Sequence, residues 1–402
     1  MIPRHHPRSM RSLLPKLLRR PEGFACLTPD RWDLVIRQAR QAGILARLCI
    51  QLDDLRILKR VPEKPRGHLE AARTLAQKHA RDVRWEVACL CRTLEHCDVP
   101  LTLLKGAAYL LADLPPARGR LFADLDILVP RSRIDEVEQI LGAADWVSAV
   151  TDFYDQRYYR RWTHQIPPLR HIRRRSVLDV HHTIVPPTAR APVDAATLAT
   201  ESLPLSHGGR LHILQPADMV LHSAVHLFND GEFDHGLRDL LDLFDLLSHF
   251  GSRPAFWETL ALRAEALSLT RPLYLSLRYL DRILGMPQPC ELREALLRWQ
   301  PPAAAQAALD ALFDRALLPD HASCDDYLTG TARWLLYVRA HYLRMPLHLL
   351  LPHLARKGFR RTAAADEKND RRSRQAQIER LLRLAPSRSD DGSHAQAVRQ
   401  RH

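Results

Sequence analysis

Two aspartates, Asp124 and Asp126, lie two residues apart in the mostly apolar segment GRLFADLDILVP. Side chains on a β-strand alternate between its two faces, so both carboxylates and Leu128 are expected on one face. The opposite face, toward the helix that follows, then carries Leu125, Ile127 and Val129. Two carboxylates a few ångströms apart repel each other, and a divalent cation between them makes the arrangement favourable. The spacing therefore predicts a metal-binding pair.

The same spacing also arises without any function. With acids at 46 of 402 positions, chance alone supplies about five acid pairs at this spacing. A half-exposed strand whose outward positions happen to be acidic is thus the simpler alternative. The surrounding sequence decides between the two interpretations.

A short apolar run, residues 101–104, precedes the pair and ends in Lys105-Gly106. A glycine at such a turn lets backbone amides and a helix N-terminus approach a phosphate. Arg120, four residues before the first aspartate, places a further cation nearby. We therefore predict that Lys105, Gly106 and Arg120 contact a nucleotide.

A later segment, SVLDVHHTI, predicts another strand in which Asp179 and His181 share a face. Its aspartate would bring a third carboxylate beside Asp124 and Asp126. Two Mg²⁺ (or Mn²⁺) ions held by such carboxylates stabilise the attacking and leaving oxygens of nucleotidyl transfer, and a third carboxylate orients or activates the acceptor hydroxyl. The pattern indicates a metal-dependent transferase acting on an NTP.

A second group of polar residues lies further along the chain. His222 and His226 are spaced as two metal ligands on one helix face would be. The helix is otherwise apolar and lacks an HExxH pattern, which favours a hydrogen-bonded histidine pair beside the active site. Arg238, Asp239 and Asp242 begin the next helix, where a structural ion pair is the simpler interpretation.

Three segments, LTLLKGAAYLL, RLFADLDILVP and VLDVHHTI, resemble a largely uncharacterised family of bacterial nucleotidyltransferases in the DNA polymerase beta superfamily. The segments HLFNDGEFDHGLRDLLDL and YVRAHYLRMPLHLLLPHLARKG are similar to its helical C-terminal part, so the likeness spans roughly residues 28–358. The resemblance implies that Asp124 and Asp126 bind metal, that Asp179 is the third acid and that Gly106 belongs to the nucleotide-binding turn. This turn has Gly-Ala where the superfamily has Gly-Ser, and Asp124 follows Gly106 by eighteen residues instead of about ten.

The periodicities predict an α+β fold, with a small mixed-sheet nucleotidyltransferase core between N-terminal and C-terminal helical regions. A helix is expected from Pro29, capped by Thr28, and another after Ser132, which would form a capping box with Asp135. The remaining elements are expected as helices at 68–96, 107–114 and 216–354 and strands at 101–104, 120–130 and on both sides of the turn 173–175. The predicted domains are 1–27, 28–97, 98–214, 215–358 and 359–402, the first a basic extension and the last a mostly disordered basic tail.

The net charge of +13 comes from the two ends of the chain. Residues 1–20 and 356–402 hold 6 and 13 basic side chains against 0 and 6 acidic ones, which leaves 40 of each sign in residues 21–355. Contact with nucleic acid is therefore expected only through the basic ends, if at all. Seven scattered cysteines and the lack of a long apolar stretch predict a cytoplasmic protein without a membrane span.

The preferred function is Mg²⁺-dependent transfer of a nucleoside monophosphate from an NTP to the hydroxyl of a small molecule, sugar or protein. Two alternatives stay open. One is a catalytically silent protein that keeps the fold and binds a partner. The other is an RNA-modifying nucleotidyltransferase, for which the basic ends would give strongly salt-dependent binding.

Overall fold

The structure is a computed structural model that describes residues 11–97, 99–193, 195–205 and 209–350. The chain divides into two compact units, residues 1–346 and 347–402, and every described helix and strand belongs to the first. The predicted basic tail and the end of the last predicted helix lie outside the described residues.

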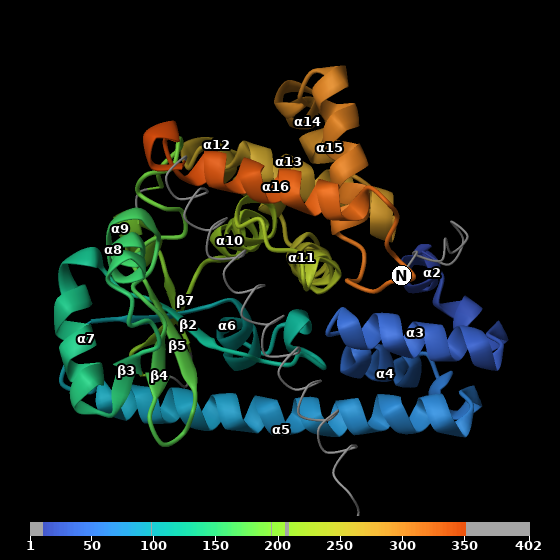
Figure 1. The fold of residues 1–402 in the computed structure, drawn as a ribbon, viewed down its shortest axis with the longest axis horizontal. Coiled ribbons are helices and arrows are strands. Elements are labelled where there is room, and N and C mark those ends of the chain that lie inside the picture. Colours follow the sequence, from blue (N-terminus) through green and yellow to red (C-terminus); the bar gives the residue numbers. More distant parts are fainter. Residues whose placement is uncertain (1–10, 98, 194, 206–208, 351–402) are drawn as a thin grey trace, which may run out of the picture. The chain divides into compact units, whose positions relative to one another are not determined.

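A single mixed sheet of seven strands is flanked by helices from both ends of the chain, which confirms the α+β prediction (Figure 1). The strand order is β3-β4-β5-β2-β1-β7-β6. β2 pairs in parallel with β5, and β1 in parallel with β7, whereas the other neighbours are antiparallel. The strands are β1 Leu101–Leu104, β2 Leu125–Leu128, β3 Trp146–Ser148, β4 Leu169–His171, β5 Val177–His181, β6 Leu203–Pro204 and β7 Leu211–Ile213.

Fifteen α-helices lie in the described part of the chain. Those before the sheet and among its strands are α2 Leu13–Arg19, α3 Pro29–Gln41, α4 Leu45–Asp54, α5 Glu63–Thr93, α6 Lys105–Leu111, α7 Ile134–Ala143, α8 Phe153–Trp162 and α9 Ala195–Thr200. Those after it are α10 Pro216–Asn229, α11 Gly236–Phe250, α12 Phe256–Ala266, α13 Thr270–Tyr279, α14 Arg293–Trp299, α15 Ala303–Ala316 and α16 Thr329–Arg344. No helix in these ranges is both long enough and apolar enough to cross a bilayer.

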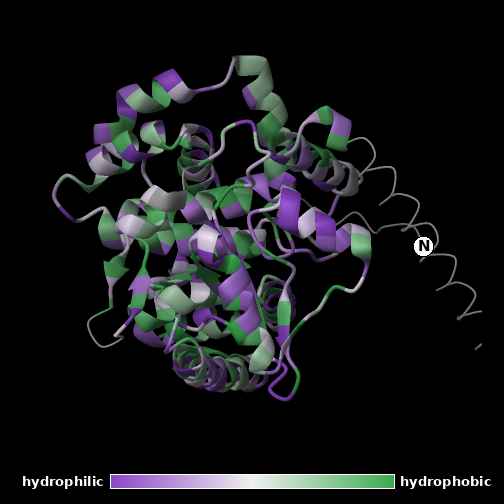
Figure 2. Ribbon diagram, turned by 90° about the vertical axis from the view of Figure 1, so that its left-hand side faces the viewer, coloured by the Kyte–Doolittle hydropathy of each residue, from purple (hydrophilic) through white to green (hydrophobic). Residues whose placement is uncertain are grey.

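Two hydrophobic cores lie on either side of the sheet. One joins the aliphatic face of β2 to α7 and to the C-terminal half of α5, and the other joins α3 and α4 to α10, α11 and α13. The helix α5 contributes to both, since Leu69 packs in the second core and Val87 in the first (Figure 1). Hydrophobic residues gather toward the middle of the described fold and hydrophilic residues toward its outside (Figure 2).

The predicted faces of the β2 strand are confirmed. Its aliphatic face packs against the inner face of α7, through Leu125, Ile127, Val129, Ile134, Val137 and Leu141. Leu128 packs in the other core, on the side where α10 lies. All four residues of β2 are buried, Asp126 included. The strand is therefore covered on both faces, as parallel central strands usually are, and Asp126 does not lie on a solvent-exposed face.

Several predicted boundaries are wrong for local physical reasons. The strand predicted over 120–130 shrinks to β2, because a loop carries the chain through residues 120–124. The Ser132 capping box does not form: residues 131–133 make a 3₁₀ turn, and α7 begins after it without a side-chain cap. Thr28 precedes Pro29 at the start of α3 as predicted, but its side chain makes no capping hydrogen bond.

Gly119 fixes the loop that leads to the aspartates. Its φ of +72° is left-handed, and a Cβ atom there would lie 2.5 Å from the backbone nitrogen of Arg47 in α4. We expect Gly119→Ala to lower the free energy of unfolding by about 2 kcal/mol or more, because it combines backbone strain with a backbone clash. Urea unfolding monitored by circular dichroism measures the loss.

Gly142 provides the matched control. It lies in α7, and a Cβ atom there would meet nothing within 4 Å. Gly142→Ala should stabilise the protein by up to about 1 kcal/mol through helix propensity. Equal midpoints for the two variants would contradict the role given to Gly119.

Candidate functional site

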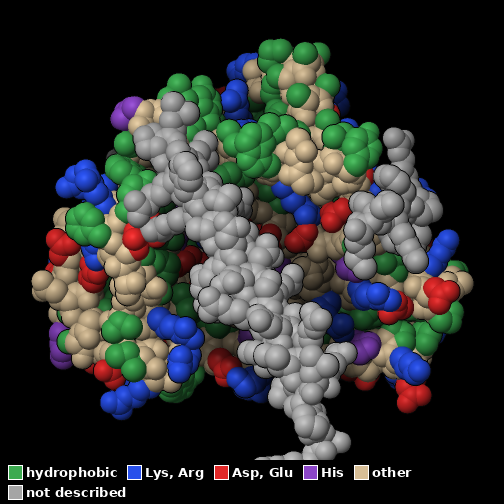
Figure 3. Space-filling view, viewed as in Figure 1, with side chains coloured by type: hydrophobic (Ala, Val, Ile, Leu, Met, Phe, Trp, Pro, Cys, Tyr) green, Lys and Arg blue, Asp and Glu red, His purple; other side chains and the backbone are tan. Residues whose placement is uncertain are grey.

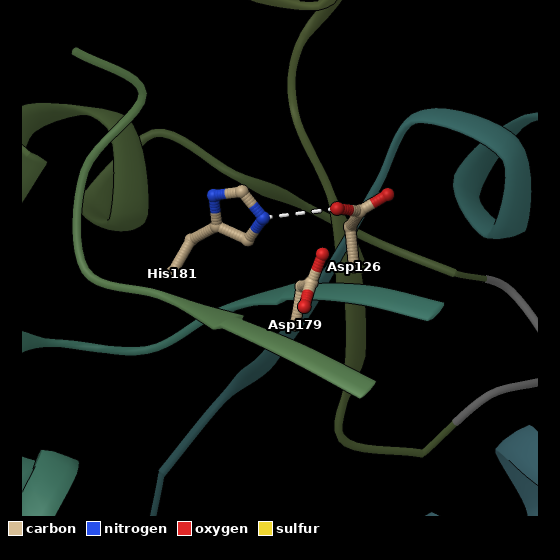
Figure 4. Close-up of side chains that lie close together, drawn as sticks. All are labelled: Asp126, Asp179 and His181. Carbon is tan, nitrogen blue, oxygen red and sulfur yellow. Dashed lines mark hydrogen bonds and ion pairs between the residues drawn. The ribbon is translucent and has the colours of Figure 1, made fainter. Parts of the chain in front are cut away.

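Asp126 and Asp179 face each other from adjacent strands. They are register partners in the parallel pair of β2 and β5, so strand alternation places both side chains on the same face of the sheet. One ligand atom from each of them and one from His181 all lie within 4.8 Å of one another (Figure 4). The structure thus assembles two of the predicted carboxylates and the predicted histidine.

His181 is a hydrogen-bond partner of Asp126. The distance from His181 Nε2 to Asp126 Oδ1 is 2.9 Å, and the imidazole is fully buried (Figure 4). Burial lowers the pKa of His181, which favours the neutral ring. Nε2 therefore donates a hydrogen bond to the carboxylate of Asp126. This hydrogen bond fixes the orientation of the carboxylate.

Two more buried imidazoles surround His181. The ring of His164 lies 5.1 Å from that of His181, and the ring of His222 lies 6.3 Å away on the side of α10. Burial, followed by the charges of Lys105 and His181, lowers the pKa of His222 well below its usual value. Burial has the same effect on His164. The aspartates are thus bordered by neutral rings.

Lys105 supplies positive charge beside the aspartates. Its Nζ lies 3.5 Å from Asp126 Oδ1. Burial acts to lower the pKa of Lys105, but the carboxylates of Asp126 and Asp230 outweigh it and raise the pKa above its usual value. The backbone of Lys105 has a φ of +44°, a conformation that costs on the order of 1 kcal/mol in a residue with a Cβ.

The same charges act on Asp126 in the opposite direction. Burial acts to raise its pKa, but the ammonium of Lys105 and the hydrogen bond from His181 hold the pKa far below its usual range. Asp126 is therefore ionised at every physiological pH.

Asp179 has no comparable compensation. Burial first, and then the charges of Asp126 and Asp124, raise its pKa to about 7. Its Oδ1 atom is buried without a hydrogen-bond partner among the described residues. A buried carboxylate oxygen without a donor is costly unless a cation neutralises it.

Asp124 lies just before β2 and is exposed to solvent. It does not belong to the group whose ligand atoms lie within 4.8 Å of one another. Desolvation by the surrounding protein, followed by the charge of Asp126, nevertheless raises its pKa. Asp124 therefore lies within electrostatic reach of Asp126, although the residue as a whole is exposed.

The predicted nucleotide-binding residues Gly106 and Arg120 contact each other. A Cβ atom on Gly106 would lie 3.1 Å from Arg120 Nε and 3.0 Å from a ring carbon of Phe122. Arg120 is ion-paired with Asp242 of α11. Close packing therefore explains why residue 106 is a glycine. The guanidinium of Arg120 already has a protein partner, Asp242.

These residues suit a hard divalent cation. Three carboxylates, Asp124, Asp126 and Asp179, act electrostatically on a single ammonium, that of Lys105, so the group carries excess negative charge when all three are ionised. Carboxylate oxygens are the ligands that Mg²⁺ and Mn²⁺ prefer. Oδ1 of Asp179 is a buried carboxylate oxygen that receives no hydrogen bond from the described residues.

Residues 28–285 match a protein family described as uncharacterised nucleotidyltransferase. The chain belongs to this nucleotidyltransferase family. It is accordingly an enzyme of the class that transfers phosphorus-containing groups, with a general role in nucleotidyl transfer. No curated protein matches the chain.

The nucleotidyltransferase match covers the sheet and the helices α3 to α13. All the residues described at the site fall within it. Within this region His226 and Arg238, the weaker predictions, lie on α10 and α11. Arg238 pairs with the neighbouring Asp239, its Nη2 lying 2.9 Å from Oδ1, which agrees with the structural ion pair expected from the sequence.

Sequence reasoning missed one acidic residue, Asp230, whose charge acts on Lys105. Asp230 follows α10, and its Oδ2 lies 2.6 Å from His226 Nδ1. The signal was present, because Asp230 is four residues after His226 and therefore on the same side of the helix. The glycine after Asp230 indicates the end of a helix, which is a structural signal and does not point to a functional residue.

Proposed function

We propose that the enzyme moves a nucleoside monophosphate from an NTP to an acceptor hydroxyl with the help of Mg²⁺ or Mn²⁺. The observation that carries the proposal is the pairing of Asp126 with Asp179, two carboxylates opposed on adjacent strands with one buried oxygen unpartnered. Like charges at this separation are favourable chiefly around a divalent cation.

In this proposal Asp124, Asp126 and Asp179 hold two ions. Bound there, the metal neutralises the charge that develops on the phosphoryl oxygens. Asp126 is held ionised and oriented by Lys105 and His181, so no proton has to leave it before an ion binds. Asp124 is exposed and is the carboxylate that reaches the ion from the solvent side.

The nucleotide is proposed to lie beside Lys105, Gly106 and Arg120. Lys105 is a mobile point charge suited to a phosphate oxygen, and its ammonium already lies beside Asp126. Arg120 is less free, because its ion pair with Asp242 would have to be shared with the nucleotide. Lys105 is therefore the principal phosphate contact in this arrangement.

The acceptor is proposed to be a small molecule, a sugar or a protein. Residues 21–355 carry equal numbers of acidic and basic side chains. On the face shown in Figure 3, basic and acidic side chains are interspersed outside the grey residues. Nucleic-acid binding needs clustered basic charge, so a nucleic-acid acceptor would depend on the basic ends of the chain.

Thermal unfolding tests this function directly. The four NTPs are each added with and without Mg²⁺ to the wild type and to Asp124→Asn. Because specific binding raises the midpoint by mass action, we expect one NTP to raise it only when Mg²⁺ is present. The rise should be lost, or reduced to that of the metal-free sample, in Asp124→Asn.

Asp135→Asn is the matched control, since it removes an exposed carboxylate on α7, away from the group around Asp126. It should keep the full response to Mg²⁺ and NTP. A wild type that responds to no NTP would instead favour the silent binding protein. A response that survives in Asp124→Asn would remove Asp124 from the metal site.

A further inference from the structure

His226 and Asp230 form a hydrogen-bonded pair at the end of α10. Nδ1 of the imidazole lies 2.6 Å from Asp230 Oδ2. Arg344 of α16 holds the carboxylate from its other side, with Nη1 3.4 Å from Asp230 Oδ1 and Nη2 2.9 Å from the backbone oxygen. Burial acts to raise the pKa of Asp230, but the hydrogen bond to His226 and the charge of Arg344 outweigh it and leave the pKa well below its usual value.

The second ring nitrogen of His226 has no such partner among the residues that the structure describes. Nε2 lies 3.9 Å from Asp239 Oδ2, which is beyond hydrogen-bonding distance. The side chain is 35% exposed. In the neutral ring, the ionised carboxylate at Nδ1 holds the proton there and leaves the lone pair on Nε2.

His226 lies on the side of α10 that borders the aspartates. It is one helical turn beyond His222, whose ring contacts that of His181. A positive charge on this ring lowers the pKa of Asp124 and of Asp126, which places the ring within electrostatic reach of both. The pair of His226 and Asp230 therefore lies at the end of α10, the helix whose His222 contacts the candidate metal site through His181.

We propose that His226 is the general base that takes the proton of the acceptor hydroxyl. This inference rests on the proposed function and adds a catalytic residue to it. The acceptor oxygen forms a bond to the α-phosphorus of the NTP, the bond from that phosphorus to the bridging oxygen of the β-phosphate breaks, and pyrophosphate leaves with the electron pair. The hydroxyl proton moves to Nε2, and Asp230 stabilises the imidazolium that results.

Asp179 is less suited to this task than His226. Its carboxylate lies on the sheet beside Asp126, where its charge is needed against a cation. His226 is separate from that group and partly exposed, so it can return its proton to solvent after each turnover. Asp230 is a positioning residue in this scheme, because it fixes the tautomer and orientation of the ring without touching the acceptor.

The test measures pyrophosphate release from the NTP that stabilises the protein, with Mg²⁺ present and with glycerol as the hydroxyl probe. We expect His226→Gln to lower kcat by about 10²-fold to 10⁴-fold, while the midpoint shift caused by NTP and Mg²⁺ stays as in the wild type. In His226→Ala, added imidazole should restore part of the rate, because a free base can occupy the space left by the ring. His96→Gln, which changes an exposed histidine in the turn after α5, should behave as the wild type.

Asp230→Asn separates positioning from folding. It should lower kcat with little change in the KM for the NTP, and imidazole should not rescue it, because the ring is still present but misoriented. An unchanged kcat in His226→Gln would overturn the inference. So would a wild type that binds NTP with Mg²⁺ yet releases no pyrophosphate. If no NTP with Mg²⁺ shifts the midpoint of the wild type, the proposed function itself fails.

Discussion

Asp126→Asn is expected to lower kcat for nucleotidyl transfer by about 10³-fold or more. The asparagine keeps the shape of the side chain and can still accept the hydrogen bond from His181. It removes a carboxylate that the structure holds ionised at every physiological pH, and with it the charge that faces Lys105. Pyrophosphate release at saturating NTP and Mg²⁺ measures the loss.

The fold should survive this change. Lys105 remains in the field of Asp124, Asp179 and Asp230, so its ammonium is not left uncompensated. Circular dichroism should therefore match that of Asp135→Asn, the exposed control, and kcat of the control should equal that of the wild type. If Asp126→Asn kept more than a tenth of the wild-type kcat, Asp126 would not be at the reacting centre.

Asp179→Asn is expected to stabilise the metal-free protein above about pH 7. The pKa of Asp179 is about 7 in the folded protein, whereas an unfolded aspartate has a pKa of about 3.9. The folded state therefore binds the extra proton between these values. The stabilisation that comes from binding this proton is complete below about pH 4 and is lost as the pH rises through about 7. An asparagine has no such loss, so the variant should exceed the wild type at pH 8 by an amount on the order of a few kcal/mol.

The stabilisation of the wild type by Mg²⁺ should have the opposite dependence on pH. Mg²⁺ binds the ionised carboxylate, so its stabilisation of the wild type should grow from pH 6 to pH 8. Asp179→Asn should show no such growth, since nothing at that position ionises. Urea unfolding at pH 5, 6, 7 and 8, with and without Mg²⁺, measures both effects. Parallel pH profiles for wild type and variant would show that Asp179 is not the titrating group.

The predictions that held are those fixed by strand alternation. Period-two geometry alone placed Asp126 opposite the aliphatic face that packs on α7, and it placed Asp179 and His181 on one face of β5. The aspartates meet because β2 and β5 pair in register. The register between two strands depends on the whole sheet. Local sequence patterns therefore could not determine that Asp126 lies beside Asp179.

The features that sequence patterns missed depend on contacts between distant segments. The strands β3, β6 and β7 have two or three residues each, too few for a period to be recognised. Lys105 adopts a left-handed conformation that propensity argues against, and Asp230 joins the site through His226 and Arg344. The close packing of Arg120 and Phe122 around Gly106 likewise joins segments that no local pattern connects.

During translation, Asp126 is synthesised well before Asp179, the residue that it faces across the sheet. Parallel neighbours such as β2 and β5 require a long crossover, and here it contains α7, β3, α8 and β4. While the crossover is still being synthesised, the strand of Asp126 can pair only with β1, and the carboxylate of Asp179 does not yet stand beside it. A cation at this site therefore cannot template the early sheet. A bound cation would instead stabilise the sheet after β5 has been added to it. It would therefore favour the completed fold over any shorter nascent chain.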